Sequence, residues 1–239
     1  MKFVKLAIVL LPTFPGQYPA LLQRSFAGIK MLERLILTLQ RADLDEIVIL
    51  SQGSIGDIRD KIEENMANDP RFKAKITWHE QAENKGQKIW QQIESLIGSQ
   101  KFLLMKGNMV VTATTIQDFI EQSIKEGMFE QDVIVGLEGP QIKLGNIFLS
   151  PSSKLETLKN YIKDPNTQRL GNVISLDGPK HFGELVEDEP SARQTERTFI
   201  NLHKHYYSQF MDFWVNSYFS LKISSLLVRT SITPNALTL

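Results

Sequence analysis

The residues best suited to contacting a phosphate or a polar base edge lie in the segment Glu83-Asn84-Lys85-Gly86, immediately before a predicted helix. The first turn of a helix has free backbone amides, and the helix dipole favours anions there. Asn84 and Gly86 are therefore candidate ligand-binding residues. A plain turn at the start of a helix explains these residues equally well, because Gly and Asn are common in turns.

Metal and thiol chemistry is restricted by composition. The chain has no cysteine, so disulfides and thiolate chemistry are excluded, and a metal would need oxygen or imidazole ligands. His203 and His205 are two residues apart in a predicted helix. They would therefore lie on different faces, and we do not expect them to share a metal. His79 and His181 are isolated in the sequence.

The elements that must position the candidate residues alternate between strand and helix. In the predicted helix at 29–41, the apolar residues Leu32, Leu35, Ile36 and Leu39 fall on one face. The alternation predicts an α/β fold with a mostly parallel sheet and helices on its faces. The predicted strands lie near 4–11, 45–51, 74–79, 101–106 and 132–137, and the other helices near 55–67 and 87–97.

The pattern loosens after about residue 139. Shorter strands are predicted near 145–149, 172–176 and 182–187, with a helix near 153–163. The Asp-Gly-Pro at 177–179 is typical of a turn. Residues 191–229 contain no Gly or Pro, which predicts one long helix or two.

Charge and hydropathy exclude some classes of function. Lys+Arg and Asp+Glu each number 27, so the formal net charge is zero and we expect no nucleic-acid partner. The apolar run from Leu6 to Leu11 lacks the cleavage site of a secretory signal, which favours a buried strand. No later window approaches the roughly 18 apolar residues of a membrane span. We therefore expect a soluble, cytoplasmic domain.

Two segments resemble a known family. Residues 28–34, Gly-Ile-Lys-Met-Leu-Glu-Arg, correspond to G-K-P-L-I-E-R of sugar nucleotidyltransferases. Residues 41–48, Arg-Ala-Asp-Leu-Asp-Glu-Ile-Val, correspond to R-A-G-I-D-E-I-V-V of the same family. Residues 1–198 resemble this family, and most closely its inositol-1-phosphate cytidylyltransferase branch. The resemblance implies a Rossmann-like sheet and transfer of a nucleotidyl group, from CTP or another nucleotide, to a phosphorylated polyol or sugar.

The same resemblance implies a layout for the site. The phosphates would lie near Gly16 and near Arg24, which would reach the space of the family lysine, and the base near Asn84 and Gly86. Magnesium would be the cofactor. Asn108 and Asp188 stand where the family places its two magnesium-binding aspartates, Asp188 within a segment that matches D-V-D-T-P-E-D. The alternative for Asp188 is capping of the last helix.

The family's catalytic positions are altered in this chain. The loop after the first strand has one glycine and the prolines Pro12, Pro15 and Pro19, and proline fixes φ and removes an amide donor. Asn108 brings no charge, whereas magnesium sites usually rely on one or two carboxylates. Two functions therefore stay open: a nucleotidyltransferase, and a catalytically inactive scaffold or regulatory domain.

The C-terminus carries a second resemblance. Residues 226–239, which end in Ile-Thr-Pro-Asn-Ala-Leu-Thr-Leu, resemble the segment that leads into the first membrane helix of CDP-alcohol phosphatidyltransferases. This implies a nucleotidyltransferase-like domain at 1–198 and an aromatic-rich helical appendage at 199–239, at the inner face of the membrane, in phospholipid or polyol-phosphate synthesis. Packing of the aromatic residues on the α/β core, or against a second copy in a homodimer, is the alternative.

Overall fold

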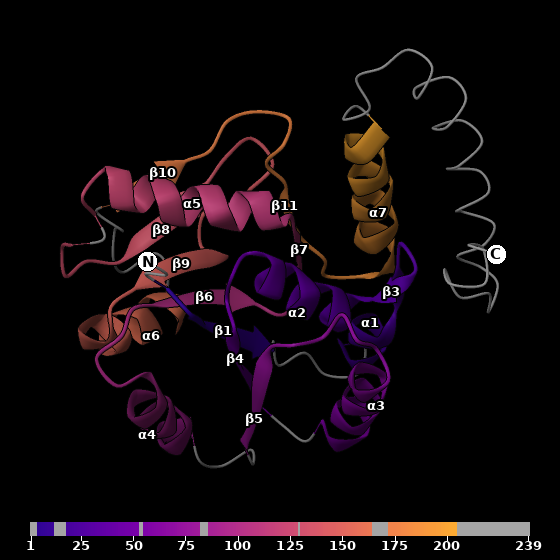
Figure 1. Cartoon of the computed structure of the whole chain (residues 1–239), viewed down its shortest axis with the longest axis horizontal. Coiled ribbons are helices and arrows are strands. Elements are labelled where there is room, and N and C mark those ends of the chain that lie inside the picture. The colour runs from indigo at the N-terminus through magenta and orange to yellow at the C-terminus, as the bar shows by residue number, and fades with distance from the viewer. Residues whose placement is uncertain are drawn as a thin grey trace.

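A seven-stranded sheet forms the centre of the protein, in the order β10-β8-β9-β6-β1-β4-β5 (Figure 1). The computed structural model describes residues 4–11, 18–52, 55–81, 86–128, 130–163 and 172–204. Within this sheet β9 is antiparallel to its neighbours and the other pairs are parallel, which confirms the predicted α/β class. The strands are β1 (Leu6–Leu11), β4 (Glu46–Gln52), β5 (Lys75–Gln81), β6 (Phe102–Lys106), β8 (Val135–Glu138), β9 (Ile147–Ser150) and β10 (Asn172–Ser175).

Helices cover both faces of this sheet. The apolar face of α2 packs on one side of the sheet, where Leu32, Leu35, Ile36 and Leu39 are all at most 2% exposed. Burying each of these side chains stabilises the fold by roughly 1.5–3 kcal/mol relative to leaving it in water. α3 and α5 contribute to the same core, whereas α4 and α6 pack on the opposite face. These helices are α2 (Met31–Arg41), α3 (Gly56–Ala67), α4 (Gly86–Ile97), α5 (Ala113–Lys125) and α6 (Leu155–Lys163).

The central strand β1 is buried on both faces. Ala7 and Val9 join the core beside α2, and Leu6 and Ile8 join the core beside α4 and α6. A strand covered on both faces is a near-continuous apolar run, which is why residues 6–11 imitate a signal sequence. β1 pairs in parallel with β4 on one side and β6 on the other, so the sheet's topology changes direction at this strand.

Two pairs of short strands lie beyond the main sheet, and only one of their members was predicted. β2 (Ser25–Phe26) and β3 (Ile29–Lys30) form a hairpin, so the helix expected from residue 29 begins at Met31. Ala27 and Gly28 form the turn with positive φ, 45° and 84°. The predicted strand near 182–187 is β11 (Gly183–Leu185), which pairs with β7 (Met109–Val111).

The last described helix, α7 (Glu189–Lys204), stands beside the hairpin (Figure 1). It runs without a break across the position expected for the boundary between residues 1–198 and 199–239. Phe199 packs edge-on against Phe26 and Phe182, with ring centroids 5.7 Å apart in both pairs. The compact part of the chain therefore continues past Thr198. No helix among the described residues is long and apolar enough to cross a membrane.

Candidate functional site

The carboxyl ends of β1 and β6 are the expected position of a ligand. In open α/β sheets, ligands bind outside the carboxyl ends of the strands, at the point where the strand order reverses. Here that point lies between β1 and β6. The two ends are held together because the Gly107 amide donates to the Leu10 carbonyl at 2.7 Å. A Cβ on Gly107 would lie 2.4 Å from Leu11 Cδ2 and 3.3 Å from the Leu10 carbonyl oxygen, so a side chain there would require the Leu11 side chain to move.

Asn108 follows this contact and joins β6 to the segment before α7. Its Nδ2 donates to the Val186 carbonyl at 2.9 Å, and its own carbonyl accepts from the Val186 amide at 2.9 Å. Asn108 is 1% exposed, and its Oδ1 has no hydrogen-bond partner within the described part of the chain. Leaving such an acceptor unpaired costs about 1–3 kcal/mol. The Oδ1 atom is therefore free to accept a hydrogen bond from a water or an amide, or to coordinate a cation.

Asp188 caps α7. Its Oδ1 accepts from the Ser191 amide at 2.8 Å, and Ser191 Oγ accepts from the amides of Asp188 and Glu187 at 3.0 and 3.1 Å. These bonds satisfy amides that the helix leaves without partners. Hydrogen bonds from Ser191 lower the pKa of the Asp188 carboxyl. The capping role that the sequence left as an alternative is thus present in the structure.

These residues do not fit an ordinary magnesium site. Asn108 supplies a neutral oxygen, and Asp188 already accepts from the first turn of α7. Across the described ranges, no group of three or more His, Asp or Glu side chains is placed to hold a metal ion. A magnesium site usually keeps one or two carboxylates for the ion. We therefore assign no chemical step to magnesium.

Arg24, the candidate phosphate-binding cation, is paired with α7. Its Nε lies 3.0 Å from Glu189 Oε2, and its Nη2 lies 3.3 Å from Glu196 Oε2. The third nitrogen, Nη1, is buried without a hydrogen-bond partner among the residues described. The two carboxylates offset the charge of the guanidinium, so Arg24 adds little positive potential to its surroundings in this arrangement.

Arg34 is a structural residue within one of the matched motifs. From α2 its Nε donates to the Phe26 carbonyl at 3.1 Å and its Nη2 to the Ala27 carbonyl at 2.9 Å. The guanidinium also lies 5.2 Å from the ring centre of Phe199. Burial, together with the charge of Arg41, lowers the pKa of Arg34 to about 10. The matched residue Arg34 therefore connects the β2–β3 hairpin to α2 and α7.

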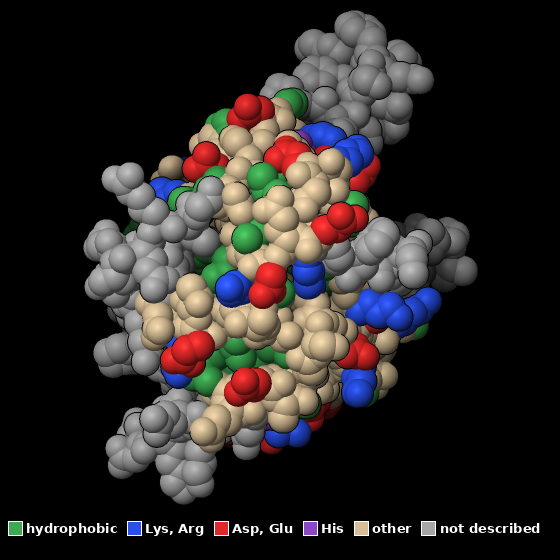
Figure 2. Space-filling model, turned by 90° about the vertical axis from the view of Figure 1, so that its left-hand side faces the viewer, with side chains coloured by type: hydrophobic (Ala, Val, Ile, Leu, Met, Phe, Trp, Pro, Cys, Tyr) green, Lys and Arg blue, Asp and Glu red, His purple; other side chains and the backbone are tan. Residues whose placement is uncertain are grey.

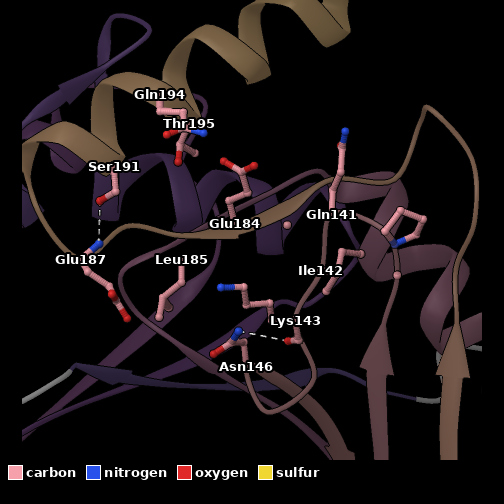
Figure 3. A pocket seen from close by; sticks show the side chains of 13 residues that line it. Gln141, Ile142, Lys143, Asn146, Glu184, Leu185, Glu187, Ser191, Gln194 and Thr195 are labelled. Carbon is pink, nitrogen blue, oxygen red and sulfur yellow. Dashed lines mark hydrogen bonds between the residues drawn. The ribbon is translucent and has the colours of Figure 1, made fainter.

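A pocket of about 410 Å³ lies between the β8–β9 connection and the β11–α7 segment (Figure 3). In Figure 3 Glu184 is seen between the α7 side chains Gln194 and Thr195 and the Lys143 side chain. No motif or spacing in the sequence indicated this pocket. Its polar lining consists of Gln141, Lys143, Asn146, Glu184, Glu187, Ser191, Gln194 and Thr195.

Close packing shapes one wall of this pocket. A Cβ on Gly183 would come within 2.8 Å of Met109 Cε and 3.2 Å of Ile142 Cγ1. Gly183 therefore lets β11 approach β7 and the β8–β9 connection closely. The signal available in the sequence was the set of glycines at 139, 145 and 183, which mark turns and close approaches.

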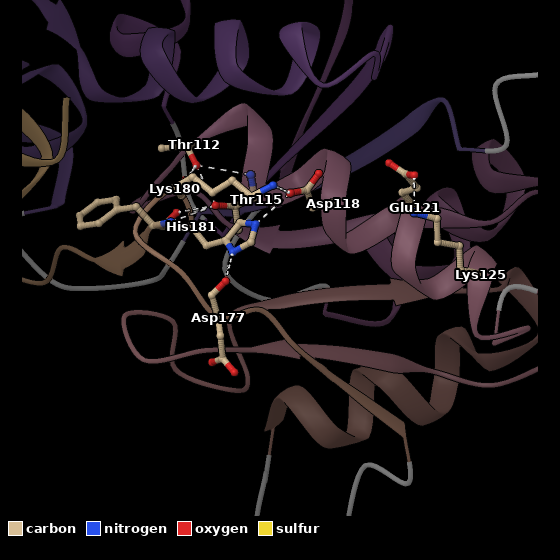
Figure 4. Close-up of polar contacts among 9 residues, drawn as sticks. Thr112, Thr115, Asp118, Glu121, Lys125, Asp177, Lys180 and His181 are labelled. Carbon is tan, nitrogen blue, oxygen red and sulfur yellow. Dashed lines mark hydrogen bonds and ion pairs between the residues drawn. The ribbon is translucent and has the colours of Figure 1, made fainter. Parts of the chain in front are cut away.

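A polar cluster holds the turn before β11 against α5 (Figure 4). His181 Nε2 lies 2.9 Å from Asp118 Oδ2, and its Nδ1 lies 2.9 Å from the Asp177 carbonyl. Lys180 Nζ contacts the same Asp118 oxygen at 2.6 Å. Partial burial opposes ionisation of Asp118, but hydrogen bonds from His181 and Lys180 outweigh it and lower the pKa of the carboxyl. The cluster positions the strand that lines the pocket.

The remaining candidates are only partly placed. Gly86 is the first residue of α4, as the predicted helix start requires. Gly16 and Asn84 lie outside the described residues, as does His205, and their roles stay predictions. Figure 2 shows acidic and basic side chains interspersed on the face that it presents, with no basic stripe among the residues described there.

Comparisons with known proteins identify the fold. No protein-family model and no curated protein sequence matches the chain. A Bacillus anthracis structure described as a glucose-1-phosphate thymidylyltransferase, in complex with sucrose, matches at TM-score 0.58 and 11% identity, covering 80% of this chain and 94% of that one. The inositol-1-phosphate CTP transferase of T. maritima matches at TM-score 0.56 and 13% identity. The match covers 83% of this chain and 96% of that one. A UDP-glucose pyrophosphorylase from Acinetobacter baumanii matches at TM-score 0.56 and 8% identity. The match covers 92% of this chain and 99% of that one. The chain therefore has a nucleotidyltransferase-type fold.

Proposed function

We propose that this chain is a nucleotidyltransferase-like domain that binds a phosphorylated polyol or sugar but does not catalyse magnesium-dependent nucleotidyl transfer. Its role is that of a scaffold or regulatory domain for a membrane-bound CDP-alcohol phosphatidyltransferase. The observation that carries the proposal is that three candidate residues for the family's chemistry, two at matched positions and Arg24 near the space of the family lysine, make structural contacts here. Arg24 pairs with α7, Asp188 caps α7 and Asn108 bonds to Val186.

The pocket supports the choice of ligand. Its volume of about 410 Å³ falls within the usual range for small-molecule sites. Glu184, Glu187, Gln194 and Asn146 offer acceptors and donors that suit several hydroxyl groups. Lys143 supplies a cation for a phosphate. The T. maritima neighbour is described as an inositol-1-phosphate CTP transferase, which makes inositol 1-phosphate a reasonable first probe.

Attachment to a membrane enzyme rests on the C-terminal sequence. Residues 226–239 resemble the entry segment of CDP-alcohol phosphatidyltransferases, and they follow α7 in the sequence. Liposome co-sedimentation of the whole chain against a version that ends at Lys204 tests this part of the proposal. We expect only the whole chain to sediment with the liposomes. Equal behaviour of the two proteins would contradict membrane attachment through residues 205–239.

Calorimetry with inositol 1-phosphate and with CTP separates binding from catalysis. We expect inositol 1-phosphate to bind without nucleotide or magnesium, and Lys143→Ala to weaken it about tenfold or more because a charge-assisted contact is lost. Lys61→Ala, on the exposed surface of α3, is the matched control and should have no effect. Binding that is unchanged in Lys143→Ala would place the ligand elsewhere.

An active cytidylyltransferase is the second candidate function. The buried Oδ1 of Asn108, which has no partner among the described residues, favours it because this atom could accept from a metal-bound water. Pyrophosphate release from CTP and inositol 1-phosphate in the presence of magnesium is the assay. We expect no release above the buffer rate. Sustained release that Asn108→Ala abolishes would establish the enzyme and contradict the scaffold proposal.

A further inference from the structure

We propose that His181 carries a proton on both ring nitrogens in the folded protein, and that this makes the turn before β11 sensitive to alkaline pH. The turn covers residues 177–181 and leads into β11, whose residues Gly183, Glu184 and Leu185 line the pocket. The protonation of His181 does not depend on the ligand proposed above, so its test uses no ligand. Failure of the proposed function would therefore leave it standing.

Both ring nitrogens of His181 face acceptors (Figure 4). Nδ1 lies 2.9 Å from the Asp177 carbonyl oxygen, and Nε2 lies 2.9 Å from Asp118 Oδ2. A neutral imidazole has one N–H group and one lone pair. In either neutral tautomer, one of the two contacts would therefore place a lone pair against an acceptor. Only the imidazolium, which has two N–H groups, donates a hydrogen bond in both contacts.

The carboxyl group of Asp118 is ionised in this arrangement. Lys180 Nζ, which can only donate, lies 2.6 Å from the same oxygen that His181 contacts. Partial burial opposes ionisation of Asp118, but hydrogen bonds from His181 and Lys180 outweigh it and lower the pKa of the carboxyl. The His181 side chain is 6% exposed, and a buried charge needs a partner. The Asp118 carboxylate is that partner.

Two charged groups face the ring within the described part of the chain: Asp118, from α5, and Lys180, from the turn itself. In Figure 4 the Asp177 carboxylate points away from the ring, and Glu121, farther along α5, pairs with Lys125. Lysine ordinarily releases its proton only near pH 10, and aspartate is already ionised at neutral pH. Between about pH 6.5 and 8.5, the change expected in this cluster is therefore loss of the second ring proton.

The residue after His181 is held by other contacts. The Phe182 amide donates to Thr115 Oγ1 at 2.9 Å, and this hydroxyl donates to the Phe182 carbonyl at 3.2 Å. The same carbonyl accepts from the Thr112 amide at 3.2 Å. Loss of the His181 proton should therefore weaken the turn at 177–181 and leave Phe182 in place.

Nitrogen NMR of the whole chain, labelled at histidine, measures the protonation state. At pH 7.5 an ordinary histidine is about nine-tenths neutral. We expect both ring nitrogens of His181 to give the shifts of protonated nitrogens at that pH, with His181→Gln identifying the signals. In Asp118→Asn the ring should be neutral, because no carboxylate balances its charge and the new amide can donate to a ring lone pair. A neutral His181 ring in wild type at pH 7.5 would overturn the proposal.

Urea unfolding at several pH values tests the effect on stability. Below about pH 6.5 His181 is protonated in both the folded and the unfolded chain, so it adds no pH dependence. Above this pH the unfolded chain binds fewer protons, because the folded chain must give up a hydrogen bond to release one. The unfolding equilibrium constant should then rise with pH by up to about tenfold per pH unit more in wild type than in His181→Gln. Asp118→Asn, which keeps the ring, should also lose this dependence. Parallel curves for the three chains would contradict the proposal.

Hydrogen exchange locates the change within the chain. The His181 amide donates to the Gly178 carbonyl at 3.2 Å, inside the turn, whereas the Phe182 amide donates to Thr115. We expect the protection factor of the His181 amide to fall about tenfold between pH 6.5 and 8.5, after correction for the intrinsic effect of pH on exchange. Protection of the Phe182 amide should stay unchanged. Constant protection at His181, or an equal loss at both amides, would overturn a pH-sensitive contact confined to the turn.

Discussion

Asn108 and Val186 exchange two hydrogen bonds, each of 2.9 Å, across 78 positions of the sequence. One uses the Asn108 side chain as donor and the other uses its backbone carbonyl. This pair connects the carboxyl end of β6 to the segment that enters α7. Asn108, where the resemblance implies a metal ligand, therefore also makes a structural contact between two distant segments of the chain.

Asn108→Asp should destabilise the protein by about 1–3 kcal/mol. The carboxylate cannot donate to the Val186 carbonyl, and the buried acceptors would then face each other. Urea unfolding at neutral pH measures the effect. Asn68→Asp is the matched control, because Asn68 also donates to a carbonyl, that of Glu64, but at an exposed helix end. An Asn108→Asp chain that is as stable as wild type and binds CTP with magnesium would instead support a metal site.

Asp188→Asn should keep most of the thermal stability, whereas Asp188→Ala should lower Tm. Asn and Asp cap helices about equally well, and Ala offers no acceptor for the Ser191 amide. Thermal unfolding of the three proteins gives the ranking. Ser191→Ala should resemble Asp188→Ala, because Ser191 supplies the reciprocal contacts. A loss of stability in Asp188→Asn as large as that in Asp188→Ala would show that the charge matters more than the cap.

The Asp118 cluster should make the protein sensitive to acid. The pKa of Asp118 is lowered in the folded state, so its contribution is fully present above the ordinary pKa of about 3.9. It is lost as the pH falls through the lowered folded-state pKa. The free energy of unfolding should therefore decrease more steeply below about pH 4 in wild type than in Asp118→Asn. Glu121→Gln, on the exposed surface of α5, is the control. Parallel curves for wild type and Asp118→Asn would contradict this role.

Phe199→Ala should destabilise the protein by about 3 kcal/mol, and Phe199→Leu by less, because the ring fills the junction between the hairpin and α7. A chain truncated after Thr198 should lose at least as much stability relative to one that ends at Lys204. Denaturant unfolding compares them, with Arg197→Ala on the exposed side of α7 as control. Equal stability of the two truncated chains would instead support a domain boundary at residue 198.

The local pattern of apolar residues was sufficient to predict helices that bury one face against the core. The helical spacing of Leu32, Leu35, Ile36 and Leu39 requires an apolar neighbour on one side only, and all four are buried as predicted. β1 could be recognised because a strand covered on both faces must be apolar throughout. α5 was not predicted: no element was assigned between the predicted strands near 101–106 and 132–137. Its start had a recognisable signal, because the Thr112 side chain caps the helix by accepting from the Thr115 amide.

The candidate site depended on partners that are distant in sequence. The sequence indicated Arg24 as a cation, but only the tertiary structure placed Glu189 and Glu196 beside it, with Glu196 172 positions away. The pocket likewise combines residues 139–146 with residues 183–195, and neither segment has a local period that indicates a cavity. Composition and periodicity determined the α/β class, because burial of side chains imposes a repeat on each element. The pairing of charges and the position of the pocket were decided by how α7 and β11 return to the sheet, and such long-range contacts leave no repeat in the sequence.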